Sequence, residues 1–462
     1  KVAKLKDESR TEELYRMLII SKCNQFHGWM PFMFEKIDDS RDYTELLLPE
    51  GLLNEGSVVR ALVSEIPEED WKNVEIIGWM YQFYMFEKKD ELIKAKKKYK
   101  NNEIPTVTQL YTPDWMVRYM VDNTLGRLWL EAYPESGIRS KMEFYIEPRN
   151  LTDEEKKEIK ANAFNNVKPE EIKFIDPACG SGHILVYAFD LFFEMYKEFG
   201  YIEREIPGLI LKNNLYGLDI DERAIQLSCF SILMKARSKA RKIFDDKAYL
   251  NVHCFVETNA IEINNSNLAL LIERFINAKT TGSLIKTHDL NFKTIDSVLK
   301  QLEDSEDMHQ SHIAETLISV TLLGKILDSK YHCVVTNPPY VGNKYMSSEI
   351  SEFLGNKYPN TKSDLFSAFV ERCFSLSLES GYLGFVTPFV WMFIQSYERL
   401  RNEITNSKTI TTLIQLEYNA FEAACVPACT YTLKNKKISV NGDFIRLTDF
   451  TGSDNQPIKT LE

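Results

Sequence analysis

From Lys173 onward, short apolar runs alternate with helical segments, and this alternation constrains the fold more than any other feature. Helix-forming stretches separate most of the runs, which is typical of a doubly wound α/β fold with a mostly parallel, Rossmann-like sheet. Only a short segment without a helix separates the last two runs, so they are expected to form an antiparallel hairpin at the sheet edge. The sequence therefore predicts seven strands, at 173–175, 215–219, 252–256, 332–336, 381–387, 411–416 and 428–433.

Other parts of the chain depart from this pattern. Residues 1–104 predict an N-terminal helical domain, because 71–97 carries apolar and aromatic residues at helical spacing. The α/β domain is expected over 105–440, and 262–330 is interpreted as a helical insertion because it is about twice as long as a crossover needs. Residues 441–462 are polar and strand-like, and we interpret them as the start of a linker or target-recognition region.

Two local patterns predict helix boundaries before the α/β region. Thr112-Pro113-Asp114 is typical of a helix start, with Thr112 as the cap and Pro113 at the first helical position. The polar, charged segment 150–170 predicts a solvated helix or connector.

Charge and composition limit the classes of function. The net charge is −11, from 56 basic and 67 acidic residues, which argues against an extended DNA-binding surface but leaves room for a local basic cleft. Eight cysteines are scattered without a CxxC pair, and the seven histidines complete no zinc set. We therefore expect no metal, and reduced, buried thiols of a cytoplasmic protein.

The ends and the hydropathy of the chain carry further expectations. No apolar run reaches the roughly 18 residues of a membrane span, so no membrane association is expected. The first ten residues, KVAKLKDESR, lack the apolar core of a secretory signal. They also lack an initiator Met, and we interpret the chain as a fragment or a trimmed product.

The segment 176–182, DPACGSG, predicts a cofactor-binding turn, because it follows a strand and precedes a helix. Glycines at such a turn allow a ligand to approach the backbone closely. A third glycine in GxGxxG spacing is missing, which weakens a dinucleotide interpretation. The Asp176 carboxylate would repel a phosphate but would suit the amino group of a methionine moiety. The next strand ends in Asp219, where an acidic residue can bind a ribose diol, while Asp221 is the better helix cap.

The segment 337–340, NPPY, predicts a catalytic loop, because it follows the buried strand YHCVVT. Its two prolines fix an extended loop. The Asn337 side-chain oxygen and the Pro338 carbonyl could then accept both hydrogens of a planar amino group, while Pro339 stiffens the loop. Tyr340 offers a ring against which a flipped base could stack. Transfer of an activated methyl group to that nitrogen requires positioning more than a general base.

These motifs, in this order, make residues 105–435 resemble the gamma class of amino-group DNA methyltransferases. The resemblance implies that Thr112-Pro113 caps the methionine end of S-adenosylmethionine and that Phe369, in the segment DLFSAF, lies near the cofactor adenine. It also implies that Phe421, six residues before Pro427, stacks on the target base opposite Tyr340. The residues expected to contact the cofactor are Thr112, Pro113, Asp176, Pro177, Ala178, Gly180, Gly182, Asp219, Ile220, Asn259 and Phe369.

One position departs from the family. Its members usually carry an Asp after the third strand, in contact with the cofactor's adenine amino group. Here that strand reads HCFVETNAI, and Asn259 aligns best, although it offers only a neutral acceptor.

More narrowly, the chain resembles the PglX-type adenine methyltransferases of bacteriophage-exclusion (BREX) systems. The stretches that carry this resemblance include EIIGWMYQFYMFEKKDEL, VTQLYTPDWMVRYMVDNTLGRLW and NPPYVGNKYMS. It implies methylation of adenine N6 in double-stranded DNA, by base flipping, to mark host DNA alongside other BREX proteins. Because such proteins are much longer, it also implies that a C-terminal target-recognition part lies outside this chain.

Other functions compete with this interpretation. The NPPY motif also occurs in enzymes that methylate glutamine side chains or RNA guanine, and cytosine N4 is chemically close to adenine N6. A fused nuclease would need an acid–acid-x-lysine set on strands, and the nearest candidate, Glu87-Lys88-Lys89, lies on an expected helix. A binding subunit that has lost catalysis remains open because of the altered third-strand position.

Overall fold

The computed structural model describes most of the chain, and every structural statement below refers to this part. The described residues are 10–34, 36–37, 48–72, 76–244, 249–259, 261, 263, 265–303, 308–418, 421 and 427–462.

A single sheet of eight strands, in the order β3-β2-β1-β4-β5-β7-β6-β8, forms the centre of the fold. Strand β7 runs antiparallel to β5 and β6, and the other neighbours are parallel. The doubly wound, mostly parallel sheet predicted from the sequence is thus confirmed. The strands are β1 Phe174–Asp176, β2 Leu215–Asp219, β3 Asn251–Cys254, β4 Tyr331–Thr336, β5 Ser377–Pro388, β6 Thr409–Gln415, β7 Ala428–Lys434 and β8 Asp443–Arg446.

Two details of the predicted sheet are wrong. The sheet has eight strands rather than seven, because β8 pairs in parallel with β6. For the same reason the β6–β7 hairpin is not at the edge. The backbone groups on the outer side of β6 need hydrogen-bond partners, and β8 supplies them. Strand β8 was not counted among the predicted strands because its sequence, DFIR, is only four residues long and contains only two apolar residues.

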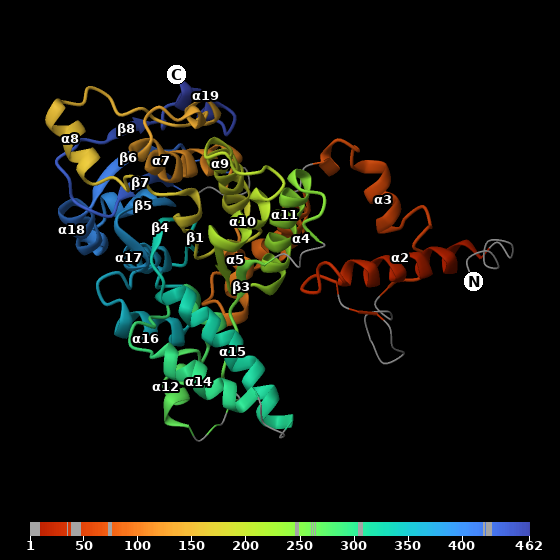
Figure 1. Cartoon of the computed structure of the whole chain (residues 1–462). Coiled ribbons are helices and arrows are strands. Elements are labelled where there is room, and N and C mark those ends of the chain that lie inside the picture. The colour runs from red at the N-terminus through yellow and green to blue at the C-terminus, as the bar shows by residue number, and fades with distance from the viewer. Residues whose placement is uncertain are drawn as a thin grey trace.

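Helices cover both faces of the sheet (Figure 1). Neighbouring residues of a strand point to opposite faces, so Phe174 packs into one apolar core and Ile175 into the other. The first core contains α6 Asp114–Val121, α7 Arg127–Ala132, α9 His183–Glu198, α10 Ile206–Asn213 and α11 Glu222–Lys239. The second contains α12 Ser266–Arg274, α14 Phe292–Glu303, α15 Met308–Asp328, α17 Leu365–Leu376 and α18 Glu398–Ser407.

Helices outside these two cores extend the body. Near the N-terminus, α2 and α3 stand apart from the sheet, and α12, α14 and α15 project together on another side (Figure 1). The chain also forms α2 Thr11–His27, α3 Val58–Glu65, α4 Ile76–Ala95, α5 Ile104–Thr108, α8 Asp153–Ala161, α13 Ala278–Thr281, α16 Ser348–Lys357 and α19 Asn455–Leu461. None of the helices in the described ranges combines the length and apolar character needed to cross a bilayer.

The predicted helix starts differ in accuracy. Thr152 caps α8 through a reciprocal capping box with Glu155, and no residue of α8 is buried, so the solvated helix is confirmed. The predicted start at Thr112 is wrong by one residue. Pro113 occupies the cap position and α6 begins at Asp114, because the Thr112 hydroxyl accepts a hydrogen bond from Asn337 instead of capping the helix.

A buried ion pair joins the sheet to the helices of the first core. Lys434 Nζ on β7 lies 2.7 Å from Glu131 Oε2 on α7, and the side chains are 0% and 12% exposed. The Tyr382 hydroxyl donates to the same carboxylate. Burial lowers the pKa of Lys434, and the Glu131 charge opposes that shift. Removing one partner would leave the other charge buried and uncompensated.

We expect Lys434→Met to lower the free energy of unfolding by about 3–5 kcal/mol, the usual cost of breaking a buried pair. The matched control is Lys436→Met, because Lys436 pairs with Glu379 at 2.8 Å on the surface, with the side chains 40% and 76% exposed. That change is expected to cost no more than about 1 kcal/mol. Urea unfolding of both variants measures the difference in the free energy of unfolding. Equal losses of this free energy would show that the buried pair stabilises the fold no more than the surface pair does.

Candidate active site

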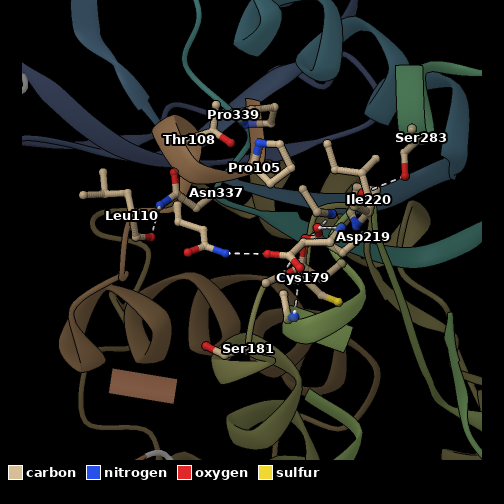
Figure 2. Close-up of a pocket in the computed structure, with 18 of the residues that line it drawn as sticks. Pro105, Thr108, Leu110, Cys179, Ser181, Asp219, Ile220, Ser283, Asn337 and Pro339 are labelled. Carbon is tan, nitrogen blue, oxygen red and sulfur yellow. Dashed lines mark hydrogen bonds between the residues drawn. The ribbon is translucent and has the colours of Figure 1, made fainter. Parts of the chain in front are cut away.

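A pocket opens at the carboxyl ends of β1, β2 and β4, where ligands bind in doubly wound sheets. About 1150 Å³ of space free of atoms lies within it, part of it open to solvent. Asn337 and Leu110 lie on one side, and Asp219 and Ile220 lie across from them (Figure 2). The wall also includes residues of α4, α5 and α17 and the 280–284 segment. Segments that lie far apart in the sequence thus build one cavity.

The turn after β1 forms the floor of this pocket. Gly180 and Gly182 adopt positive φ angles of 50° and 89°, which L side chains rarely adopt. A Cβ on Gly182 would also lie 2.4 Å from Ser228 Oγ, whereas one on Gly180 would meet nothing within 4 Å. Gly182 is the cap residue of α9. The backbone at Gly180 is therefore open to a ligand, while Gly182 allows close packing beneath it.

Two carboxylates lie in this floor. Asp176 Oδ1 accepts a hydrogen bond from Ala178 N at 3.1 Å, and burial, with the Asp219 charge, raises the pKa of Asp176 to about 7. Asp219 accepts from Gly180 N at 2.8 Å and from Asp221 N at 2.9 Å. Burial raises the pKa of Asp219 to about 6. The described residues of the pocket lining include no Lys or Arg, so a cationic ligand would stabilise both ionised carboxylates.

A third carboxylate, Asp221, holds the pocket wall together. Its Oδ1 accepts from Arg223 N at 2.9 Å, which confirms its predicted role as the cap of α11. Its Oδ2 accepts from the Tyr81 hydroxyl at 2.9 Å and from Gln109 Nε2 at 2.7 Å. Sequence reasoning missed Tyr81 and Gln109, because these partners precede Asp221 by 140 and 112 residues and no local pattern marks them.

The NPPY loop after β4 brings Asn337 to the rim of the pocket. Asn337 Nδ2 donates to Thr112 Oγ1 at 3.1 Å and lies 3.5 Å from the Leu110 carbonyl oxygen. These acceptors fix which end of the amide carries the oxygen. Asn337 Oδ1 accepts from the Tyr340 hydroxyl, which also lies 2.9 Å from the Val386 carbonyl. A carbonyl oxygen has two lone pairs, so Oδ1 can still accept one hydrogen from a ligand.

Tyr340 itself lies beneath the loop rather than in the pocket wall. Its ring meets Phe366 edge-on, with centroids 6.3 Å apart. Burial raises the pKa of Tyr340 well above its ordinary value, so the hydroxyl remains a donor. Pro339 lines the pocket, whereas Pro338 is buried and does not.

The structure brings together most of the predicted cofactor residues. Thr112, Asp176, Pro177, Ala178, Gly180, Asp219, Ile220 and Phe369 all line the pocket. Pro113 and Gly182 adjoin it without lining it. Asn259 is exposed and away from the lining, and its Oδ1 accepts from Asn277 N at 2.8 Å. Near the end of β3 the wall is instead made by Phe255 and Ser283, whose hydroxyl donates to the Pro177 carbonyl at 2.6 Å.

Phe421 also lies away from the pocket wall. It is 4% exposed and packs into the first apolar core with Leu416 and Ala428. Residues 419–420 and 422–426 around it lie outside the described part of the chain. Among the described side chains, no group of three or more His, Cys, Asp or Glu is placed to hold a metal ion.

Comparisons with known proteins connect this site to a family. The family described as Eco57I restriction-modification methylase matches residues 213–421. The adenine-specific methyltransferase BrxX of Escherichia coli O9:H4 (strain HS) is 40% identical over 466 aligned residues, which cover 92% of this chain and 38% of BrxX. This chain is a homologue of adenine-specific methyltransferases. A second homologue, PglX of Lacticaseibacillus casei (strain Zhang), is 35% identical over 96% of the chain and 39% of PglX.

The homologues are much longer than this chain, which spans about two fifths of their length. Among solved structures, a nuclease-deletion mutant of the Type ISP restriction-modification enzyme LlaGI, in complex with a DNA substrate mimic, is similar to 99% of the chain. The identity is 14%, the TM-score is 0.48, and 35% of the LlaGI chain is covered. The resemblance to the PglX-type methyltransferases that the sequence motifs indicated is confirmed by the two homologues.

Proposed function

We propose that this chain transfers a methyl group from S-adenosylmethionine to N6 of adenine in DNA. The observation that carries the proposal is the Asn337 amide, held by Thr112 at the rim of a pocket that also contains Asp176 and Asp219. This arrangement places an oriented carbonyl acceptor beside a site suited to a cationic, ribose-bearing cofactor. The homology to BrxX and PglX supports the choice of adenine as the target.

The residues of the pocket fit S-adenosylmethionine. Asp176, buried without a basic partner in the lining, would pair with the amino group of the methionine part. Asp219, at the end of β2, would accept hydrogen bonds from the ribose hydroxyls. Ile220, Phe255 and Phe369 offer apolar surface for the adenine ring. When bound, the cofactor supplies an electrophilic methyl group on a sulfonium.

The chain's own residues would position the acceptor nitrogen. Asn337 Oδ1 and the Pro338 carbonyl would accept the two hydrogens of the adenine amino group, which directs its lone pair toward the pocket. In this step the Tyr340 hydroxyl would turn from Asn337 Oδ1 to the Val386 carbonyl, which is already within 2.9 Å. One lone pair of Asn337 Oδ1 is already free, and this rotation would free the second without moving the ring.

Base flipping and recognition extend this proposal. The target base would leave the duplex, because the amino group cannot otherwise reach the loop, and would stack on Tyr340, whereas stacking on Phe421 would require that side chain to leave the apolar core. The methyltransferase domain would occupy 105–440, with a helical domain at 1–104 and a helical insertion at 262–330. Segment 441–462 would lead toward a C-terminal target-recognition part, although β8 within it already joins the sheet. The enzyme would act in the cytoplasm with other BREX proteins to mark host DNA.

Methyl transfer can be tested directly. The purified chain is incubated with S-adenosylmethionine labelled at the methyl group and with genomic DNA from a strain lacking adenine methylation. Digestion to nucleosides and mass spectrometry should then show labelled N6-methyladenine. Label in N4-methylcytosine would overturn the adenine assignment, and no label in any nucleoside would overturn the activity itself.

The raised pKa values predict a pH-dependent cofactor affinity. Asp176 and Asp219 have pKa values of about 7 and 6, and a cationic ligand favours their ionised forms. Affinity should therefore increase as pH rises from 5, by up to about tenfold per pH unit for each group that must lose a proton, most steeply below about pH 6, where both groups are protonated, and should level off above about pH 7. Calorimetry in buffers of different ionisation enthalpy measures both the affinity and the protons released. A dissociation constant that stays the same from pH 5 to 8 would contradict this prediction.

A further inference from the structure

A cluster of lysines lies beside the catalytic loop and belongs to none of the sites described above. Lysine occupies five of the seven positions from 94 to 100, KAKKKYK, in a chain whose net charge is −11. Lys94 pairs with Asp90. The other four are exposed, and no ion pair with them occurs within the described ranges. An isolated run of lysines is usually only a solvated surface. Whether this run has a function therefore depends on its position in the fold.

The backbone fixes this run against the segment that follows NPPY. Tyr99 N donates to the Tyr345 carbonyl at 2.8 Å, and the two rings stack with centroids 5.7 Å apart and an interplanar angle of 22°. Ile104, Val341 and Met346 continue the contact as a shared apolar cluster. The lysine run is therefore held at the rim of the catalytic loop, not on a distant surface.

Two further lysines join it there. Lys344 is exposed, and its Nζ lies 5.5 Å from the Tyr345 ring centre. Lys362 is also exposed and adjoins Ser363, whose carbonyl accepts from Asn343 N at 3.0 Å. We name this set the basic patch, which consists of Lys96, Lys97, Lys98, Lys100, Lys344 and Lys362. Glu103 also lies at the patch, where its carboxylate accepts from Lys100 N at 2.8 Å.

At the end of α4, a strained backbone conformation accompanies the placement of the lysines. Lys96 adopts a φ of 51° at the end of that helix, a conformation in which glycine is usual and other residues are strained. The left-handed turn redirects the chain after Ala95, so that Lys97, Lys98 and Lys100 leave the helix and run toward Tyr345.

We propose that the basic patch binds the backbone phosphates of the DNA strand next to the flipped adenine. The inference rests on the proposed function, because that function requires a duplex at this edge of the pocket. Lys344 follows Tyr340 by four residues, and an extended chain of that length spans at most about 14 Å. One DNA strand carries a phosphate about every 3.4 Å along the axis, so Lys344 lies within roughly four nucleotides of the target base, and the rest of the patch adjoins it.

Lysine suits such contacts, because a mobile point charge binds phosphate without reading sequence. The patch would then position the duplex for any target sequence, and recognition of the sequence itself would fall to other residues. It would also give this acidic chain a local basic surface with which to approach DNA.

The salt dependence of DNA binding tests this proposal. The unsubstituted chain and the triple variant Lys96→Gln, Lys97→Gln, Lys98→Gln are titrated with a fluorescent 30-base-pair duplex at several salt concentrations. Each phosphate contact contributes a slope of about −0.9 to log K against log salt. The triple variant should therefore lose on the order of 2 to 3 units of slope, while its calorimetric affinity for S-adenosylmethionine stays the same.

A matched control removes the same charge elsewhere. Lys156, Lys157 and Lys160 are exposed on α8, and changing all three to Gln should leave the slope as it is. If the patch variant and this control have equal slopes, and the unsubstituted chain methylates DNA, the proposed phosphate contacts of the basic patch are overturned and the proposed function stands. A reduced slope in a chain that transfers no methyl group to DNA would support the phosphate contacts and overturn the proposed function. Absence of duplex binding by the unsubstituted chain at low salt would also overturn the patch.

Discussion

Replacing Asn337 with alanine should reduce methyl transfer to DNA by at least about 100- to 1000-fold, the usual loss when one oriented polar group is removed from a reacting centre. The variant loses the carbonyl that would hold the adenine amino group. The Asp176 and Asp219 carboxylates and the Gly180 turn do not depend on this side chain, so the affinity for S-adenosylmethionine should change less than about threefold. Nucleoside mass spectrometry and calorimetry measure the two quantities separately.

The appropriate control for Asn337→Ala is Asn343→Ala. Asn343 is an exposed residue of the same loop, and its backbone N–H, which the substitution keeps, makes the hydrogen bond to Ser363. Its loss should leave turnover nearly the same. Unchanged N6-methyladenine in DNA treated with Asn337→Ala would remove Asn337 from the catalytic role. A parallel loss of cofactor affinity would instead show that the substitution had disturbed the pocket.

The second large effect is expected from Asp219→Ala. If the carboxylate binds the ribose hydroxyls, its removal should weaken S-adenosylmethionine binding by about 10- to 100-fold, as the loss of charge-assisted hydrogen bonds predicts. Part of the effect would come from the protein itself, because Gly180 N and Asp221 N lose their acceptor. Calorimetry measures the affinity, and thermal unfolding shows whether the pocket floor remains folded.

Two further variants separate these contributions. Asp219→Asn keeps an oxygen for one of the two backbone N–H groups but lacks the charge, so it should bind the cofactor weakly while losing less stability than Asp219→Ala. Glu222→Ala removes an exposed carboxylate three residues away that does not line the pocket, and it should bind normally. Normal binding by Asp219→Ala would refute the ribose assignment.

Much of the fold could be predicted because apolar strands buried on both faces are recognisable in the sequence. Strand β4, YHCVVT, is such a run, and the predicted strand 332–336 lies within Tyr331–Thr336. Strand β8 could not be found in this way, because Phe444 is 63% exposed and the strand has few apolar neighbours to reveal it. The doubly wound topology then explains why Asp176, Asp219 and Asn337, far apart in sequence, meet at one edge.

The candidate site was predictable only where a motif follows a strand. Asp219 is the last residue of β2, Asn337 directly follows β4, and both line the pocket. Asn259 lies five residues beyond β3, and alignment by motif alone could not show that Asn277 holds it outside. The contacts of Gln109 and Ser283 depend on loops that pack together only in the folded chain.

The hydrogen bond between Thr112 and Asn337 has a consequence for synthesis of the chain. Its partners are 225 residues apart, and closing so long a loop delays folding relative to local structure. On the ribosome, the turn after β1 and the acid after β2 are made well before Asn337 emerges. A nascent chain would therefore contain both carboxylates of the cofactor site before it contains an oriented amide, and catalytic competence would arise only when the second half of the sheet docks onto the first.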